Sequence, residues 1–196
     1  IGTDAKQTKI TYSDGALDIM PEGDKRGTFR TQSVFIDADY FYARHISFCN
    51  EAGQGNKAGQ ALAVYADGDH LIFENCRFDG HQDTLFTAPL PRQEKQAGGF
   101  KGPKEFAPRR VGRHLYKDCY IAGNVDFIFG SAIAYFENCE LFMKKRTSEV
   151  SGYVTAPSTY EGQKYGYVFD HCRFTSDCPD GSAYLGRPWR KYAKCV

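Results

Sequence analysis

Two segments of this chain match one another: CRFDGHQDTLF at residues 76–86 and CYIAGNVDFIF at residues 119–129. Each begins with Cys, continues through an apolar residue, Gly and Asp, and ends on an apolar residue followed by Phe. Internal similarity of this kind indicates a repeat architecture. If the segments lie on successive turns of a parallel solenoid, Asp83 and Asp126 are stacked at about the 4.8 Å spacing of neighbouring strands.

The same Cys position recurs twice more, at Cys139 in FENCEL and at Cys172 in FDHCRF. Neither copy continues to an Asp, because the matching positions hold Arg146 and Pro179. A uniform scaffold in which only two turns carry the Asp predicts a single functional site, at those two residues.

Four of the seven Cys residues therefore occupy one repeat position, where they are predicted to stack as a ladder of inward-facing side chains. Cys119 and Cys139 would lie within disulfide reach on adjacent strands, so they are either bridged or packed as free thiols. A metal site is not indicated, because the chain has no Cys-x-x-Cys pair and its five His show no ligand spacing.

Length and charge restrict the class of protein. The 196 residues have the size of one domain and suffice to bury a core, so we expect a single domain over residues 1–196. Lys and Arg number 25 against 24 acidic residues, and this balance argues against a nucleic-acid partner or an anionic membrane. No apolar run approaches the length of a membrane span, and the first residues do not resemble a secretory signal.

The rest of the chain extends the solenoid. The segment ARHISF at residues 43–48 resembles the later repeats, with Ile46 in the Cys position, and predicts an earlier turn. Residues 87–110 lose the strand pattern and contain four Pro and six basic residues, which predicts a long loop that bulges outward. A solenoid normally needs a cap at each end, and none is recognised up to Val196, so we expect part of a larger domain.

The paired carboxyl groups of Asp83 and Asp126 are the candidate catalytic groups. A single Asp at a solenoid turn most often caps backbone groups, but two stacked carboxyl groups cannot ionise alike. One is driven toward its protonated form, particularly if a guanidinium serves the other. The pair would then supply an acid beside a nucleophile or base.

Two amides accompany this pair. Gln60 and Gln82 are either ordinary turn amides or NH₂ donors for an oxyanion that develops on a carbonyl. Gln82 and Asp83 are adjacent and would face opposite sides of a regular strand, so the backbone must bend there if both reach one site.

The segment LGRPW at residues 185–189 places Arg187 beside the single Trp of the chain. These residues are either a solvated cation and a core aromatic, or a fixed guanidinium for a carboxylate and an indole that stacks on a sugar.

At these residues the chain resembles the pectin methylesterase family of carbohydrate esterases. The matching motifs are GHQDTL at 80–85, GNVDFIFG at 123–130 and LGRPW at 185–189, with QALAV at 60–64 as a weaker fourth. The resemblance extends from about residue 28 to residue 189 and implies a right-handed parallel β-helix. The family's usual N-terminal Gly-x-Tyr-x-Glu stretch and its C-terminal cap are missing. The 87–110 loop is longer than in plant-like members, and would overhang the cleft as a lid or as a basic clamp.

The resemblance also implies roles. Asp126 would be the nucleophile and Asp83 the general acid and then base, with oxyanion donors at Gln60 and Gln82. Arg187 would hold Asp126. Trp189, together with Phe129, would line the sugar cleft.

The implied reaction is hydrolysis of the C6 methyl ester of galacturonate units in pectin, without a cofactor. The resemblance further implies a secreted enzyme, extracellular or periplasmic, and we expect a monomer whose partner is methylesterified homogalacturonan. Two alternatives stay open: a polygalacturonan glycosidase, since a carboxylate pair also suits glycosidic cleavage, and a non-catalytic pectin-binding solenoid.

Overall fold

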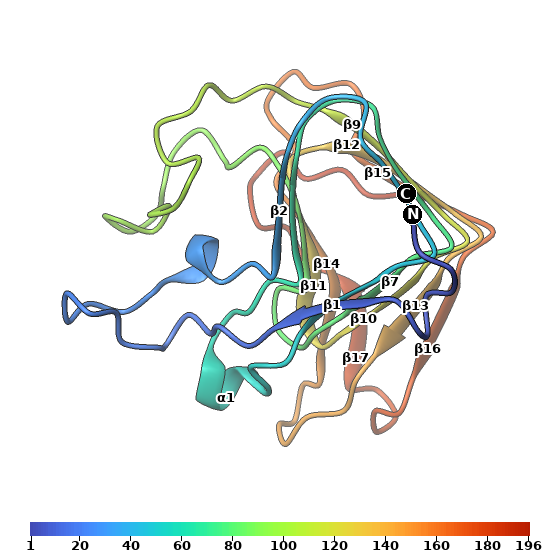
Figure 1. Cartoon of the computed structure of the whole chain (residues 1–196), viewed down its shortest axis with the longest axis horizontal. Coiled ribbons are helices and arrows are strands. Elements are labelled where there is room, and N and C mark those ends of the chain that lie inside the picture. The colour runs from blue at the N-terminus through green and yellow to red at the C-terminus, as the bar shows by residue number, and fades with distance from the viewer.

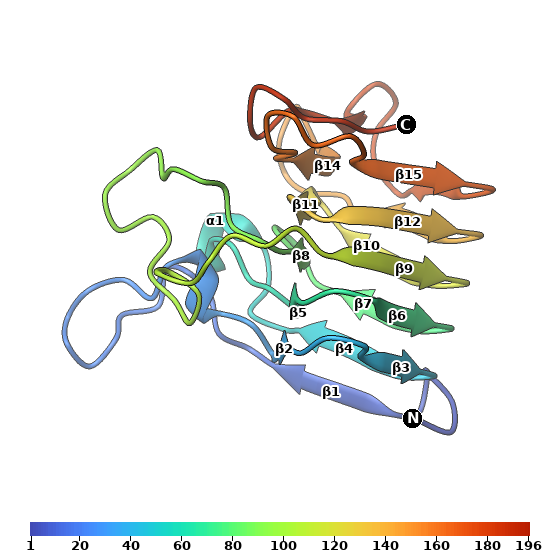
Figure 2. The same ribbon diagram turned by 90° about the horizontal axis from the view of Figure 1, so that it is seen from above.

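The computed structural model describes residues 1–196 and is a parallel β-helix. Three sheets form the sides of a roughly triangular coil (Figure 1), and successive coils lie side by side from the N-terminal to the C-terminal end (Figure 2). Every pairing between the named strands is parallel. The all-β solenoid expected from the repeats is confirmed. None of its helical segments has the length and apolar character of a membrane span.

Each complete coil contributes one strand to each sheet. The first sheet contains β1 (Lys9–Tyr12), β4 (Ser47–Asn50), β7 (Arg77–Asp79), β10 (Tyr120–Gly123), β13 (Glu140–Met143) and β16 (Arg173–Ser176). The second contains β2 (Val34–Asp37), β5 (Val64–Asp67), β8 (Leu85–Thr87), β11 (Val125–Gly130), β14 (Gly152–Pro157) and β17 (Ala183–Gly186). The third contains β3 (Tyr42–Arg44), β6 (Leu71–Glu74), β9 (Arg113–Lys117), β12 (Ile133–Glu137) and β15 (Tyr167–Asp170). Two short helical turns, η1 (Thr28–Arg30) and α1 (Gly55–Ala58), lie in connecting segments.

The repeat position of the Cys residues is a corner of the coil. Each of the four Cys directly precedes a strand of the first sheet, and these strands pair in register. The residue before each Cys has a positive φ between 49° and 53°, namely Asn75, Asp118, Asn138 and His171. Asn, Asp and His tolerate this left-handed conformation better than most residues, so they turn the chain here. His45 has a φ of 57° before Ile46, which confirms the earlier turn.

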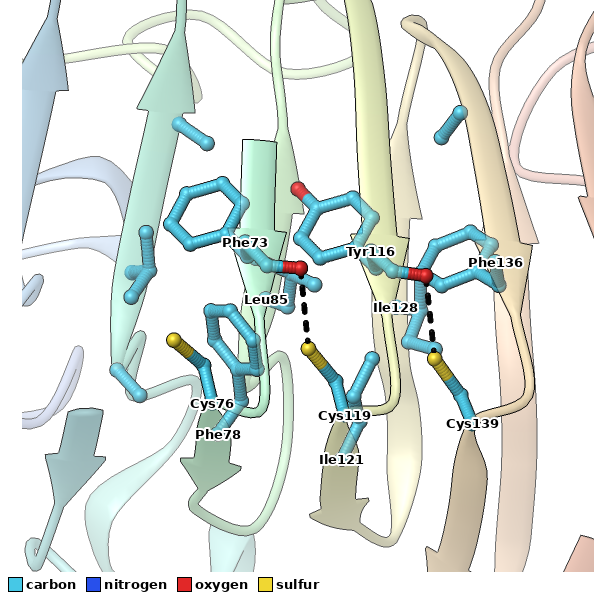
Figure 3. Packing of buried hydrophobic residues seen from close by; sticks show 14 of the residues in the cluster. Phe73, Cys76, Phe78, Leu85, Tyr116, Cys119, Ile121, Ile128, Phe136 and Cys139 are labelled. Atoms are coloured by element: carbon cyan, nitrogen blue, oxygen red, sulfur yellow. Dashed lines mark hydrogen bonds between the residues drawn. The ribbon is translucent and has the colours of Figure 1, made fainter. Parts of the chain in front are cut away.

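Inside the coil, thiols and aromatic rings stack from turn to turn (Figure 3). The Sγ of Cys119 donates a hydrogen bond to the carbonyl of Phe73 at 3.4 Å, and that of Cys139 to the carbonyl of Tyr116 at 3.3 Å. All seven Cys are free, so of the two alternatives the structure contains packed thiols. Ring centroids along the adjacent stack are 5.1, 4.7 and 4.5 Å apart, from Phe73 through Tyr116 and Phe136 to Phe169.

A second core covers the outer face of the second sheet. Because side chains alternate along a strand, Val64, Leu85 and Ile128 point into the coil while the next residue of each strand points out. The outward residues form a register row, and they are Tyr65, Phe86, Phe129 and Ala156. Phe29 and Phe100 cover this row, with ring centroids 5.9 Å apart.

Phe100 belongs to the 88–112 loop, which connects β8 to β9 and bulges away from the coil as expected (Figure 1). In both views this loop extends beside the segment that connects β1 to β2, on the side of the second sheet. The two projections frame the outer face on which the candidate site lies.

Candidate active site

Asp83 and Asp126 occupy equivalent positions on adjacent coils. Leu85 pairs with Ile128, and each Asp lies two residues before its member of that pair. The backbone N–H of Asp83 donates to the carbonyl of Val125 at 2.9 Å, which ties the two coils together at this level. The stacking predicted from the repeated segments is confirmed.

The backbone bends at both Asp residues. Asp83 has a φ of 64° and Asp126 a φ of 51°, both in the left-handed region. Residues 81–83 form a turn, which is the bend that Gln82 and Asp83 require if both are to reach one site, and the β11–β14 register shifts between Val125 and Ile128. A non-Gly residue in this region costs about 1–2 kcal/mol. The bend lets Gln82 and Asp83 reach the same cleft, although they are adjacent in sequence.

The cleft has a volume of about 340 Å³ and contains every site residue that the sequence predicted: Gln60, Gln82, Asp83, Asp126, Phe129, Arg187 and Trp189. The remaining wall comes from η1, from the 88–112 loop, from Ala156 of β14 and from Arg190. The side-chain amides of Gln60 and Gln82 make no hydrogen bond to another protein group, so their NH₂ groups are available to a ligand.

The two carboxyl groups have different environments. Asp83 is only 8% exposed; burial, followed by the nearby charge of Asp126, raises its pKa well above the usual value, and Arg187 opposes this in part. Asp126 instead forms a bidentate pair with Arg187, whose Nε and Nη2 donate to its two oxygens at 2.8 and 2.6 Å. The guanidinium also lies 4.4 Å from the ring centroid of Tyr153. This pairing raises the pKa of Arg187, which stays charged.

Trp189 and Phe129 differ in what they present to the cleft. Their rings meet at 66° with centroids 5.5 Å apart. Phe129 is 2% exposed and belongs to the second core, whereas Trp189 is partly exposed. Phe129 therefore forms the floor and supports the indole, and Trp189 offers the aromatic surface that a sugar can reach.

The motifs did not predict several residues of the cleft wall. Lys95, Gln96, Gly99 and Phe100 come from the 88–112 loop, and Arg190 follows Trp189. The loop thus overhangs the cleft, as expected. Its basic composition was the only signal in the sequence, and composition does not say which basic side chain faces the cleft. No group of three or more His, Cys, Asp or Glu side chains is arranged to hold a metal ion.

Known proteins resemble the chain in both sequence and fold. The family profile of pectinesterase matches residues 1–96 and 109–196, leaving 97–108 of the loop unmatched. Pectinesterase 31 of Arabidopsis thaliana is 34% identical over 200 residues, covering all of this chain and 54% of that protein.

Two solved structures of pectin methylesterases are also similar to this chain. The pectin methylesterase from Yersinia enterocolitica superimposes with a TM-score of 0.78 at 30% identity, covering 96% of this chain and 58% of that one. A pectin methylesterase in complex with a hexasaccharide also gives 0.78, at 31% identity, covering 98% and 56%. The chain thus spans a little over half the length of these relatives. On the profile match and the shared β-helix, this chain belongs to the pectinesterase family.

Proposed function

We propose that the protein hydrolyses the C6 methyl ester of galacturonate units in pectin, releasing methanol and leaving a carboxylate. The observation that carries this proposal is the pairing of Asp126 with Arg187 beside the buried Asp83, in a cleft with two unengaged amides. A nucleophile, an acid and oxyanion donors are the groups that acyl transfer requires. The hexasaccharide bound to one relative supports an oligosaccharide as ligand.

In the first step, a carboxylate oxygen of Asp126 attacks the ester carbonyl carbon, and the carbonyl electrons move onto oxygen. The NH₂ groups of Gln60 and Gln82 donate to this oxyanion, and one such donor contributes about 3 kcal/mol. As the intermediate collapses, the bond to the methoxy oxygen breaks and Asp83 transfers its proton to that oxygen. Methanol leaves, an anhydride links the substrate to Asp126, and Asp83 becomes a carboxylate.

In the second step, Asp83 accepts a proton from water as the water oxygen attacks the acyl carbon of the anhydride. The bond to Asp126 breaks, its carboxylate is restored, and the product is a uronic acid that ionises at neutral pH. Asp83 regains the proton with which it began, so the cycle closes without a cofactor. Arg187 fixes the orientation of the nucleophile because it engages both oxygens.

The substrate is a cell-wall polymer, so we place the enzyme outside the cell that makes it. The test is an assay for methanol and for new reducing ends after incubation of the full-length protein with methylesterified pectin. Methanol without reducing ends is expected. Reducing ends would identify a glycosidase, and binding without either product would identify a non-catalytic solenoid.

A further inference from the structure

The helical turn α1 lies between the two amides of the cleft. Gln60 follows α1 in the chain, and the side chain of Gln82 packs against the backbone of Gly55, the first residue of the turn. A Cβ atom at Gly55 would have three side-chain atoms of Gln82 as its nearest neighbours: Oε1 at 2.3 Å, Cβ at 3.3 Å and Cδ at 3.4 Å. Cβ atoms do not come within 3.0 Å of another heavy atom, so only a glycine permits this packing.

The backbone of α1 does not itself require a glycine at this position. Gly53 and Gly59, on either side of the turn, have φ values of 96° and 74°, whereas the φ of Gly55 lies outside this left-handed region. Within a helix Ala is more favourable than Gly, because Gly loses more backbone entropy on folding. Local stability would therefore favour Ala at residue 55, and the contact with Gln82 is what favours Gly.

The orientation of the Gln82 carboxamide depends on this contact. The backbone carbonyl of Gln82 accepts a hydrogen bond from the N–H of Ala61 at 3.0 Å, which fixes the main chain but leaves the side chain free to rotate. Gln82 lines both the cleft and a second hollow of about 480 Å³, which lies against α1 and residues 145–148. A carboxamide displaced from Gly55 has room to turn into that hollow and leave the cleft.

The turn is anchored to the coil that carries the proposed nucleophile. Gln54 precedes α1, and its Oε1 accepts a hydrogen bond from Nδ2 of Asn124 at 3.1 Å. Its Nε2 donates to the carbonyl of Lys145 at 3.3 Å. Asn124 is buried and lies two residues before Asp126, so the backbone against which Gln82 packs is fixed relative to Asp126.

We propose that Gly55 is a positioning residue, which holds the carboxamide of Gln82 in the cleft, where its NH₂ group meets the oxyanion. This inference rests on the proposed function and identifies what places one of its two oxyanion donors. A donor stabilises the developing charge most when it is already in place, because no free energy is then spent on turning it. A methyl group at residue 55 would displace the end of a flexible side chain, so the fold persists while the donor is lost.

Gly55→Ala separates this role from a structural one. We expect Tm to stay at or above the wild-type value, because Ala favours the helical turn. We expect kcat for methanol release to fall about 10- to 100-fold, with a much smaller change in KM, because the oxyanion exists only after attack. Lys57→Ala, at an exposed position of the same turn, is the matched control and should change neither value. A Tm of Gly55→Ala well below that of the wild type would overturn the proposal and show that Gly55 serves the fold.

A double-mutant cycle tests whether Gly55 acts through Gln82. In the Gln82→Ala background, Gly55→Ala should have no further effect on kcat, because the amide that it displaces is already gone. The same loss of kcat in both backgrounds would overturn the positioning role.

The NMR signal of the side-chain NH₂ group of Gln82, assigned by its loss in Gln82→Ala, provides a readout without turnover. It should shift in Gly55→Ala and stay in place in Lys57→Ala. If it shifts as expected but the wild type releases no methanol, the contact that holds Gln82 stands and the proposed esterase function fails. If the wild type releases methanol and kcat of Gly55→Ala is unchanged, the esterase function stands and the positioning role fails, whether or not the signal moves.

Discussion

Arg187 donates two hydrogen bonds to the two carboxylate oxygens of Asp126, at 2.8 and 2.6 Å, from a coil 61 positions further along the chain. The second sheet makes this contact possible, because β17 pairs with β14 and β14 with β11. Two parallel hydrogen bonds orient the carboxylate in a plane as well as neutralising it. The first test is therefore whether a guanidinium is required at this position, or whether any positive charge suffices.

Arg187→Lys is expected to reduce kcat by about 10- to 100-fold, because an ammonium retains the charge but cannot reproduce the bidentate contact. Methanol release at saturating substrate measures this effect. Arg173→Lys is the matched control, since Arg173 pairs with Glu140 on the exposed surface of the first sheet. Equal activity of Arg187→Lys and the wild type would show that orientation of Asp126 does not limit the reaction.

Asp126→Asn is expected to lower methanol release by at least about a thousandfold, because an amide oxygen cannot serve as the nucleophile. The fold should persist, as judged by circular dichroism and Tm, because the side chain lies at the cleft and not in the interior core. Asp180→Asn, at an exposed position without an ion pair, controls for the substitution itself. Folded Asp126→Asn protein with near-normal release would exclude this nucleophile.

Removal of one amide donor is expected to act on the rate more than on binding. Gln82→Ala and Gln60→Ala should each lower kcat by about 10²- to 10³-fold with a much smaller change in KM, because an oxyanion exists only after attack. Gln7→Ala, at an exposed position far from the cleft motifs, serves as control. A change confined to KM would assign the two amides to ground-state binding instead.

The pH dependence follows from Asp83, whose folded-state pKa is raised by burial and by Asp126. Its protonated form is the acid of the first step, so kcat should fall as pH rises through this raised pKa. Folding stability follows the same direction: the contribution of the neutral side chain is fully present below the ordinary pKa of an Asp, and is lost as pH rises through the folded-state value.

Asp83→Asn removes both dependences. The variant should turn over slowly, and its Tm relative to the wild type should increase from acidic to neutral pH, because Asn is never ionised. Thermal melts of both proteins across this range measure the difference. A constant difference in Tm at all pH values would contradict a raised pKa for Asp83.

The stacked aromatic rings predict where the coil is most sensitive to truncation. Phe73→Ala is expected to lower the free energy of unfolding by about 3–5 kcal/mol, because the ring is fully buried between neighbours above and below it. Ile72→Ala, one position earlier on β6, removes a side chain that is 38% exposed and should lower it far less. Similar losses in denaturant unfolding for the two variants would argue against the inward stack.

The local pattern of the chain predicted the scaffold and the paired Asp residues, whereas the roles of Gln60, Gln82 and Arg187 were implied only by the family resemblance. The spacing of Cys, Gly and Asp in the two matching segments predicted both the coil and the alignment of Asp83 with Asp126. A one-residue change in register would move every side chain of a strand to the opposite face. Two segments with the same order of apolar and polar residues therefore pair in one register, which stacks their Asp residues. The bend at Gln82 and Asp83 was also anticipated, because two adjacent residues share one side only if the strand ends there.

The tertiary structure decided how equivalent residues differ. Asp83 and Asp126 hold the same repeat position, but one is buried and the other is paired with an arginine from a distant coil. Lys95 and Lys101 lie in the same basic loop, but only Lys101 meets an acidic partner when the loop docks. Burial and ion pairing depend on which segments meet in space. Coil stacking and loop docking bring together residues that are far apart along the chain, and a local sequence pattern contains no information about such contacts.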